Sequence, residues 1–318
     1  LVTRPIPDAG LLLLKDHCDL RIRNSDLPPS VDELCDLIAD CDGLLCLLTD
    51  PVSREVIAAA PRLRVISTFA VGFDNIDIAA AAARGIPVGH TPGVLTETTA
   101  DLAFSLLLAA ARRLVEAARF AADGHWKSWS PTLLLGRDVA GATLGIVGMG
   151  RIGLAVARRA RGFAMKVLYC GPHNKDAADA MGCCYVPFEQ LLAESDFVSL
   201  HAPLLTSTKN LIDRPALSRM KRTAILINTA RGGCVDHDAL TEALAQGQIA
   251  AAALDVTDPE PLPREHPLYA EPRCLIVPHL GSATVDTRNR MARMAAENLL
   301  AGLRGEPLPF RVPLPAMS

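Results

Sequence analysis

The sequence is poor in aromatic residues, has no surplus of positive charge and contains no long uninterrupted apolar run. Aromatic residues make up 4% of its 318 residues, and the formal net charge is -3. Without a basic surplus, nothing in the composition indicates binding to nucleic acid or to an anionic membrane surface. The longest apolar stretch, residues 102–111, is interrupted by Ser105 and is too short to span a bilayer. We therefore expect neither a nucleic-acid partner nor a membrane.

The cysteines also lack a pattern that would suggest a disulfide framework or a metal site. There are nine of them, an odd number, and no two are spaced as Cys-x-x-Cys. Cysteines without such a pattern usually serve as small buried side chains in proteins of a reducing compartment. No signal peptide is recognisable, and we expect a cytosolic protein without a bound metal. Because Leu1 already lies in an expected strand, we also expect residues to precede it.

Short β-type runs alternate with longer Ala- and Leu-rich runs of helical length, which is typical of parallel βα units. Between two series of strands, residues 96–122 predict a long helix that begins near Thr96. The sequence therefore predicts an α/β protein with two Rossmann-like or flavodoxin-like parallel sheets. The expected strands are residues 1–3, 19–23, 43–48, 64–68 and 87–89 in the first series, and 142–147, 166–170, 196–200, 224–228, 250–256 and 275–277 in the second.

Two domains account for this arrangement. We expect one α/β domain at residues 1–95 and a second at residues 96–285. The last segment, residues 286–318, contains a helical stretch at 290–300 with no strand after it. We expect this segment to complete the first domain, and we expect the active site in the cleft between the two domains.

A glycine-rich turn marks the dinucleotide site. The apolar strand 142–147 is followed by Gly148, Gly150 and Gly153 in the pattern G-x-G-x-x-G, and then by helix-forming residues 154–158. The first glycine permits a tight turn, the second lets the backbone approach a pyrophosphate, and the third lets the helix pack on the strand. The helix N-terminus then meets the phosphate charge. A Gly-rich turn without a ligand is the alternative, but its place between strand and helix favours a dinucleotide.

The end of the next strand indicates which dinucleotide is bound. An NAD site usually has an acidic residue about twenty positions after the glycines, where it accepts from the ribose hydroxyls. Cys170 occupies that position here, and His173 and Lys175 follow it. No carboxylate would repel a 2′-phosphate, and the two basic side chains could attract one. We expect NADPH, with NADH less favoured; an ordinary solvated loop is the alternative reading.

Three successive strands of the second series end in reactive side chains. Arg231 follows strand 224–228, Glu260 follows strand 250–256, and His279 follows strand 275–277. In an open parallel sheet, ligands gather outside the carboxyl ends of the strands. An arginine fork matches a substrate carboxylate, a protonated histidine supplies a proton, and a glutamate holds the imidazole in one orientation. Each could singly be an ordinary surface or loop residue, but together they predict reduction of a 2-oxo acid.

The remaining histidines carry no such pattern. His201 follows strand 196–200 and is expected at most to line the cofactor site. The others have no recognisable partner; they are His17, His90, His125, His237 and His266.

Six motifs lie along the chain, at residues 70–74, 148–153, 200–206, 227–232, 254–256 with Glu260, and 278–284. In these motifs, and over nearly its whole length, the sequence resembles the D-isomer-specific 2-hydroxyacid dehydrogenases. Within that family it is most similar to the animal enzymes that reduce glyoxylate and hydroxypyruvate, in segments 43–48, 125–130 and 298–307.

The resemblance implies NADPH-dependent reduction of glyoxylate to glycolate and of hydroxypyruvate to D-glycerate. It implies that His279 donates the proton with Glu260 as its partner, that Arg231 binds the substrate, and that the protein is a homodimer. Trp129 would then reach the active site of the partner. The implied substrate contacts further include the N–H groups of Val71 and Gly72, and Ser282. The implied cofactor contacts are Gly148, Gly150, Arg151, Ile152, Gly153, Pro172, His173, Asn174, Lys175, Pro203, Thr229, Asp255 and Gly281.

A departure from the family pattern and several alternatives accompany this interpretation. NADP-dependent relatives carry an arginine where this chain has Pro172, which reduces the expected preference for NADPH. D-lactate and D-3-phosphoglycerate dehydrogenases are alternatives within the family, although the apolar segment 44–48 offers no basic residue for a phosphate. Formate dehydrogenases replace the glutamate found here as Glu260. A nucleotide-sensing transcriptional corepressor is an alternative of another class, but such proteins carry disordered tails, and little of this sequence has that composition.

Overall fold

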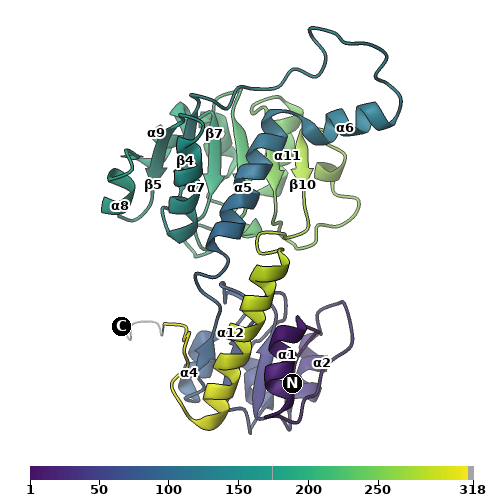
Figure 1. Cartoon of the computed structure of the whole chain (residues 1–318), viewed down its shortest axis with the longest axis vertical. Helices are drawn as coiled ribbons and strands as arrows, with labels where there is room; N and C mark the ends of the chain where they lie inside the picture. Colours follow the sequence, from purple (N-terminus) through teal and green to yellow (C-terminus); the bar gives the residue numbers. More distant parts are fainter. Residues whose placement is uncertain (174, 314–318) are drawn as a thin grey trace. The chain divides into compact units, whose positions relative to one another are not determined.

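The computed structural model describes residues 1–173 and 175–313, and these residues form two compact units (Figure 1). The first unit consists of Leu1–Leu95 together with the described chain from Ala283 onward. The second unit is Thr96–Ser282. Each unit contains its own parallel sheet, so the predicted α/β class with two parallel sheets is confirmed.

The sheet of the first unit has three parallel strands in the order β1-β2-β3, with Gly43 opposite Val65 and Ile66 opposite Val88. Helices α1 and α12 pack closely on one another: Gly10 has no room for a Cβ, which would lie 2.5 Å from the carbonyl oxygen of Ala292. The elements of this unit are α1 (Asp8–Lys15), α2 (Val31–Ile38), β1 (Gly43–Cys46), α3 (Arg54–Ala59), β2 (Val65–Thr68), α4 (Ile78–Ala83), β3 (Val88–Gly89) and α12 (Val285–Arg304).

The expected strands at residues 1–3 and 19–23 are wrong as regular strands. They are present only as isolated parallel bridges, from Val2 to Ile22 and from Val2 to Leu45. Pro5 and Pro7 come directly after the first of them, and proline cannot donate to a ladder. The bridges nevertheless continue the sheet beyond β1 in the parallel order found in flavodoxin-like folds.

The second unit has a seven-stranded, wholly parallel sheet in the order β10-β9-β8-β7-β4-β5-β6. Its central part has the Rossmann order, which reverses between β4 and β7. The short edge strand β6 was not predicted, because two exposed residues carry no hydrophobic pattern. The strands are β4 (Thr143–Val147), β5 (Lys166–Cys170), β6 (Cys184–Tyr185), β7 (Phe197–Leu200), β8 (Ile225–Asn228), β9 (Ala251–Leu254) and β10 (Cys274–Ile276).

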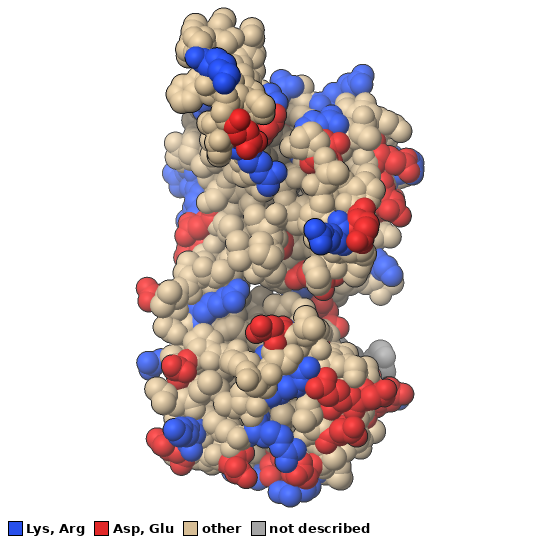
Figure 2. Space-filling view, turned by 90° about the vertical axis from the view of Figure 1, so that its right-hand side faces the viewer, with Lys and Arg blue, Asp and Glu red and all other residues tan. Residues whose placement is uncertain are grey.

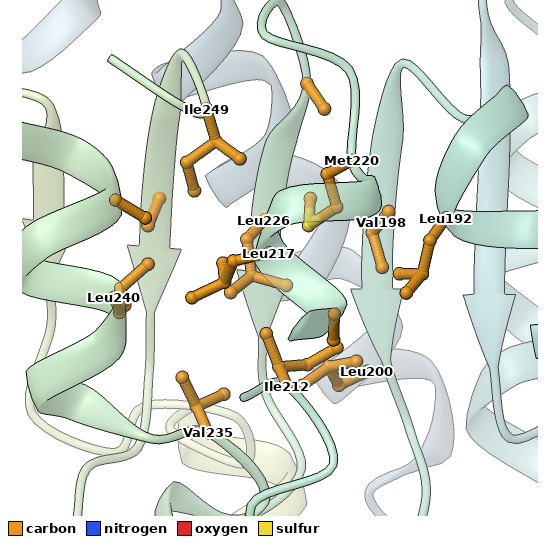
Figure 3. Packing of buried hydrophobic residues seen from close by; sticks show 14 of the residues in the cluster. Leu192, Val198, Leu200, Ile212, Leu217, Met220, Leu226, Val235, Leu240 and Ile249 are labelled. Carbon is orange, nitrogen blue, oxygen red and sulfur yellow. The ribbon is translucent and has the colours of Figure 1, made fainter. Parts of the chain in front are cut away.

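Helices cover both faces of this sheet, and so its central strands are buried apart from the first residue of β4. Helices α5 and α7 pack on one face and α9, α10 and α11 on the other (Figure 1). Figure 3 shows the second of these layers, in which Leu217 and Met220 meet Val198 and Leu226 of the sheet. The helices are α5 (Thr96–Ala111), α6 (Leu114–Ala122), α7 (Arg151–Arg161), α8 (Asp176–Asp179), α9 (Phe188–Glu194), α10 (Arg214–Arg219) and α11 (His237–Ala245), with 3-10 turns at Gly232–Cys234 and Pro267–Tyr269.

The long helix expected at residues 96–122 is interrupted. Arg113 has a φ of 53°, in the left-handed region, and separates α5 from α6. Helix α5 has seven buried residues, whereas α6 has none, so tertiary packing ends where the helix breaks. The segment after α6 continues as an extended loop (Figure 1).

The surface and the helices agree with the composition. On the face shown in Figure 2, acidic and basic side chains are interspersed rather than gathered into one field of a single sign. None of the helices in the described part of the chain is long and apolar enough to cross a membrane.

Candidate active site

The glycine-rich turn joins β4 to α7 in the second unit. Gly148 has a φ of 95°, and a Cβ at this position would lie 2.7 Å from the backbone nitrogen of Ala202. A Cβ at Gly153 would lie 2.4 Å from the carbonyl oxygen of Gly148, whereas one at Gly150 would meet no atom within 4 Å. The first and third glycines are thus required by packing. The second faces open space at the N-terminus of α7, which fits a dinucleotide pyrophosphate next to Arg151 and Ile152.

The loop after β5 is where the sequence predicts contacts with the ribose phosphate. Cys170 is buried in the hydrophobic core beneath α9, and burial, followed by the charge of Glu189, raises the pKa of its thiol to about 12. Pro172, His173 and Lys175 are exposed on the loop that follows. Asn174 lies outside the described residues.

A hydrogen bond from the backbone N–H of Lys175 to the Tyr169 hydroxyl anchors the end of this loop at 3.0 Å. That hydroxyl in turn donates to Asp179 at 2.9 Å. The loop is therefore held at its base while its basic side chains face solvent.

Asp255, directly after β9, organises the loop that follows β10. Its carboxylate accepts from the backbone N–H groups of Leu280 at 2.5 Å and Gly281 at 2.9 Å, and its carbonyl oxygen accepts from the N–H of His279. Burial raises the pKa of Asp255; the two N–H groups and the charge of His279 act in the opposite direction. The carboxylate is thus a buried link between two adjacent strand ends.

His279 and Glu260 are in direct contact. The Nδ1 atom of His279 lies 2.6 Å from Oε1 of Glu260, and the two side chains are 25% and 29% exposed. His279 has a φ of 52°, in the left-handed region; the bonds from Asp255 to the loop stabilise this uncommon conformation. Because Nδ1 is paired with the carboxylate, Nε2 is the ring nitrogen left to exchange a proton with a ligand.

Arg231 follows β8 at the same sheet edge and is half-buried, with Nη1 donating to the carbonyl oxygen of Ala230 at 2.8 Å. Asn228, fully buried at the end of β8, holds this turn. Its Nδ2 donates to the carbonyl oxygen of Arg231 at 2.8 Å, and its Oδ1 accepts from the N–H of Ala230 at 3.0 Å. The sequence interpretation gave Asn228 no role; an Asn between a buried strand and a turn is the signal that could have revealed it.

Two buried polar atoms lie close to the same edge without a hydrogen-bond partner among the described residues. They are the hydroxyl oxygen of Thr229, directly after β8, and Nδ1 of His201, directly after β7. Burial lowers the pKa of His201 to about 4, so its imidazole is neutral at pH 7, and its Nε2 contacts the Ser199 hydroxyl at 2.8 Å. A buried hydroxyl without a partner in the described structure, at the carboxyl end of a parallel strand, fits a site that takes a polar cofactor. Pro203 is exposed beyond His201.

The loop after β10 also meets α5. The carbonyl oxygen of Gly281 accepts from the Thr99 hydroxyl at 3.0 Å, so little space surrounds this buried glycine. Ser282 follows it, half-buried, as the last residue of the second unit.

In the first unit, Val71 and Gly72 form a half-buried turn after β2. Trp129 belongs to the second unit, in the loop after α6, and is 79% exposed; Trp126 is 64% exposed in the same loop. Neither tryptophan is part of the hydrophobic clusters of its unit. Within residues 1–173 and 175–313 there is no group of three or more His, Cys, Asp or Glu side chains that could hold a metal ion.

Comparisons with known proteins agree on one family. Residues 104–281 match the family model described as D-isomer specific 2-hydroxyacid dehydrogenase, NAD binding domain. The chain is 54% identical to a glyoxylate reductase of Korarchaeum cryptofilum, covering 96% of this chain and 92% of that protein. It is 47% identical to the glyoxylate reductase/hydroxypyruvate reductase of Mus musculus, covering 98% and 97%.

A solved structure gives the same result. The NADPH-dependent glyoxylate/hydroxypyruvate reductase of Sinorhizobium meliloti, in complex with NADP and malonate, is 33% identical to this chain. It superimposes with a TM-score of 0.85 and covers 98% of this chain and 95% of that one.

Proposed function

The chain belongs to the D-isomer-specific 2-hydroxyacid dehydrogenases, a family of nicotinamide-dependent oxidoreductases, and we propose that it reduces glyoxylate to glycolate and hydroxypyruvate to D-glycerate. The observation that carries this proposal is the contact between His279 and Glu260, 2.6 Å apart at the sheet edge where Arg231 and the glycine-rich turn also lie. An acid, its charged partner and a carboxylate-binding group are the three functions that the reaction requires.

In this proposal His279 is the proton donor. The Glu260 carboxylate stabilises the imidazolium and fixes the ring, so that Nε2–H faces the carbonyl oxygen of the substrate. Reduced nicotinamide, when bound, supplies the hydride that arrives at the carbonyl carbon. As the carbonyl oxygen gains charge, His279 transfers its Nε2 proton to it, and the product is the hydroxy acid with a neutral imidazole.

Arg231 and the N–H groups of Val71 and Gly72 bind the carboxylate that glyoxylate and hydroxypyruvate share. A guanidinium forms two parallel hydrogen bonds to a carboxylate. Asn228 holds the turn that carries Arg231, so the guanidinium is presented from a fixed backbone. Ser282 is assigned to the same substrate site. The first unit thus acts as the substrate-binding domain and the second as the dinucleotide-binding domain.

For the cofactor we propose NADPH in preference to NADH. The glycine-rich turn with Arg151 and Ile152 would hold the pyrophosphate, and Pro203, Thr229, Asp255 and Gly281 would line the nicotinamide half. The loop Pro172–Lys175 would meet the 2′-phosphate. Two features support the choice: β5 ends in a thiol rather than a carboxylate, and His173 and Lys175 are exposed beside it. The S. meliloti relative is named as NADPH-dependent.

We further propose a homodimer in which Trp129 reaches the partner's active site. The support is the exposure of Trp126 and Trp129 on an extended loop, since large aromatic side chains are stabilised in interfaces. Sedimentation at micromolar concentration should show a dimer; a fully active monomer would exclude this role. Nine free cysteines fit a cytosolic location.

The direct test is oxidation of NADPH by the purified protein with glyoxylate or hydroxypyruvate, with D-lactate formation from pyruvate as the comparison. We expect a stoichiometric loss of NADPH absorbance with glyoxylate or with hydroxypyruvate. A protein that binds NADPH but turns over none of these acids would instead fit the nucleotide-sensing alternative.

A further inference from the structure

His90 follows β3 in the first unit, and its ring contacts the turn that carries Val71 and Gly72. Its Nδ1 donates to the carbonyl oxygen of Val71 at 2.9 Å. The next residue, Thr91, donates its backbone N–H to the carbonyl oxygen of Ala70 at 2.8 Å. Two consecutive carbonyl groups of the turn are therefore held by two consecutive residues of one segment.

These two bonds also set the direction of two N–H groups. In a trans peptide the carbonyl group and the following N–H point to opposite sides, and neither peptide of this turn is cis. The carbonyl group of Ala70 faces Thr91 and that of Val71 faces His90, so the N–H groups of Val71 and Gly72 face away. No described residue accepts a hydrogen bond from either N–H group. Both are half-buried donors aligned for an external acceptor.

The backbone of His90 is fixed independently of its ring. Its N–H donates to the carbonyl oxygen of Phe310 at 3.0 Å, and its carbonyl oxygen accepts from Nδ2 of Asn298 at 3.0 Å. Asn298 is fully buried on α12 and also accepts from the N–H of Phe310 at 2.9 Å. Gly89 is needed for this approach, because a Cβ there would lie 2.6 Å from the Asn298 side chain. The imidazole can thus be replaced without removing the bonds that hold its segment.

We propose that His90 is a positioning residue for substrate: its Nδ1–H holds the Val71 carbonyl so that the Gly72 N–H points at the carboxylate of the 2-oxo acid. This rests on the proposed function, in which that N–H binds the carboxylate. His90 acts through Val71 and does not touch the substrate. Its loss is therefore expected to weaken substrate binding more than it slows the transfer of the proton by His279.

Two substitutions separate the N–H donor from the ring. His90→Phe removes the donor but retains an aromatic ring against Phe73, whose centroid lies 5.7 Å from that of His90. His90→Asn loses the ring but places an amide N–H near the position of Nδ1. The matched control is His17→Phe, because His17 is exposed beyond α1 in the same unit.

In His90→Phe, KM for glyoxylate should rise about 2- to 10-fold, the loss expected for one hydrogen bond. KM for hydroxypyruvate should rise by the same factor, because the carboxylate is common to both acids. KM for NADPH should stay at the wild-type level in His90→Phe, and His17→Phe should have wild-type KM values for both acids. His90→Asn should recover most of the lost substrate affinity.

An unchanged KM for both acids in a folded His90→Phe protein would refute the proposal. So would an equal rise in His90→Phe and His90→Asn, since ring packing rather than the N–H would then explain it. If the wild type itself reduced neither acid, the proposed function would be overturned and the role of His90 with it. If the wild type reduced both acids and His90→Phe had the same KM values as the wild type, only the role of His90 would be overturned.

Discussion

The contact between His279 and Glu260 leads to a quantitative expectation for catalysis. Glu260→Gln keeps the size of the side chain and an acceptor oxygen for Nδ1 of His279, but it removes the negative charge. The two atoms are 2.6 Å apart, and both side chains are about a quarter exposed. The substitution therefore tests the charge of Glu260 rather than its shape.

The size of the effect follows from this geometry. In the variant the imidazolium still donates to an amide oxygen, so what is lost is the attraction between two opposite charges, which is about 1 kcal/mol at 4 Å in water and more where the pair is partly buried. This loss, roughly 1–1.5 kcal/mol for a pair about a quarter exposed, applies to the imidazolium that must be present before proton transfer. A loss of about 1.4 kcal/mol lowers a rate tenfold. Glu260→Gln should thus lower kcat for glyoxylate roughly 5- to 10-fold.

A double-mutant cycle on kcat at saturating NADPH isolates the pair. His279→Gln alone should lower kcat about 10²- to 10⁴-fold. In that background Glu260→Gln should have almost no further effect, because its partner is absent. Glu265→Gln removes an exposed charge from the same loop and serves as the control.

Two results would contradict this reasoning. If Glu260→Gln were as mild as Glu265→Gln, the carboxylate would not assist His279. If Glu260→Gln cost the same factor with and without His279, the carboxylate would act by another route.

Three further outcomes are expected. Arg231→Lys should lower kcat/KM for glyoxylate roughly 10- to 100-fold, because a lysine cannot form the paired contact; unchanged kinetics would make Arg231 structural. Burial lowers the pKa of His201 from 6.5 to about 4, so the unfolded chain takes up this proton first as the pH falls. His201 alone should lower the free energy of unfolding by about 2.6 kcal/mol between pH 6.5 and pH 4, and urea titrations should show a weaker pH dependence in His201→Gln. Cys170→Asp should shift kcat/KM from NADPH towards NADH; an unchanged ratio would contradict the cofactor assignment.

The sheet of the second unit was largely predictable from the sequence. Strand β5 has the expected bounds, and β7 and β8 each begin one residue later than expected, because buried parallel strands appear as continuous apolar runs. The first two expected strands failed, since the prolines that follow Thr3 interrupt pairing after single bridges. Local patterns therefore identify the buried strands, but they overstate pairing where it is reduced to single bridges, and they miss the short exposed edge strand β6.

The reactive side chains could be assigned to one sheet edge because parallel strands bring their carboxyl ends together. The residues that hold the backbone of the site could not be predicted from the sequence. His90 donates to the carbonyl of Val71, and Asn228 bonds the backbone at Ala230 and Arg231. Every residue has a backbone carbonyl and nearly every residue has a backbone N–H group. A side chain that binds the backbone can therefore have any residue as its partner, and the sequence does not show which one.

Parallel strands fix only where the loops of the site begin. Contacts between the loops determine the conformation of the loops beyond those points. A Cβ at Gly232, after β8, would lie 1.9 Å from the carbonyl oxygen of Thr257, after β9, so these loops touch along their backbones. Asp255 connects the loop after β9 to Leu280 and Gly281 after β10 through both of its carboxylate oxygens. An amide in place of that carboxylate could accept only through one oxygen. Burial raises the pKa of Asp255, and the two bonds from Leu280 and Gly281, which hold the backbone directly after His279, act against that rise.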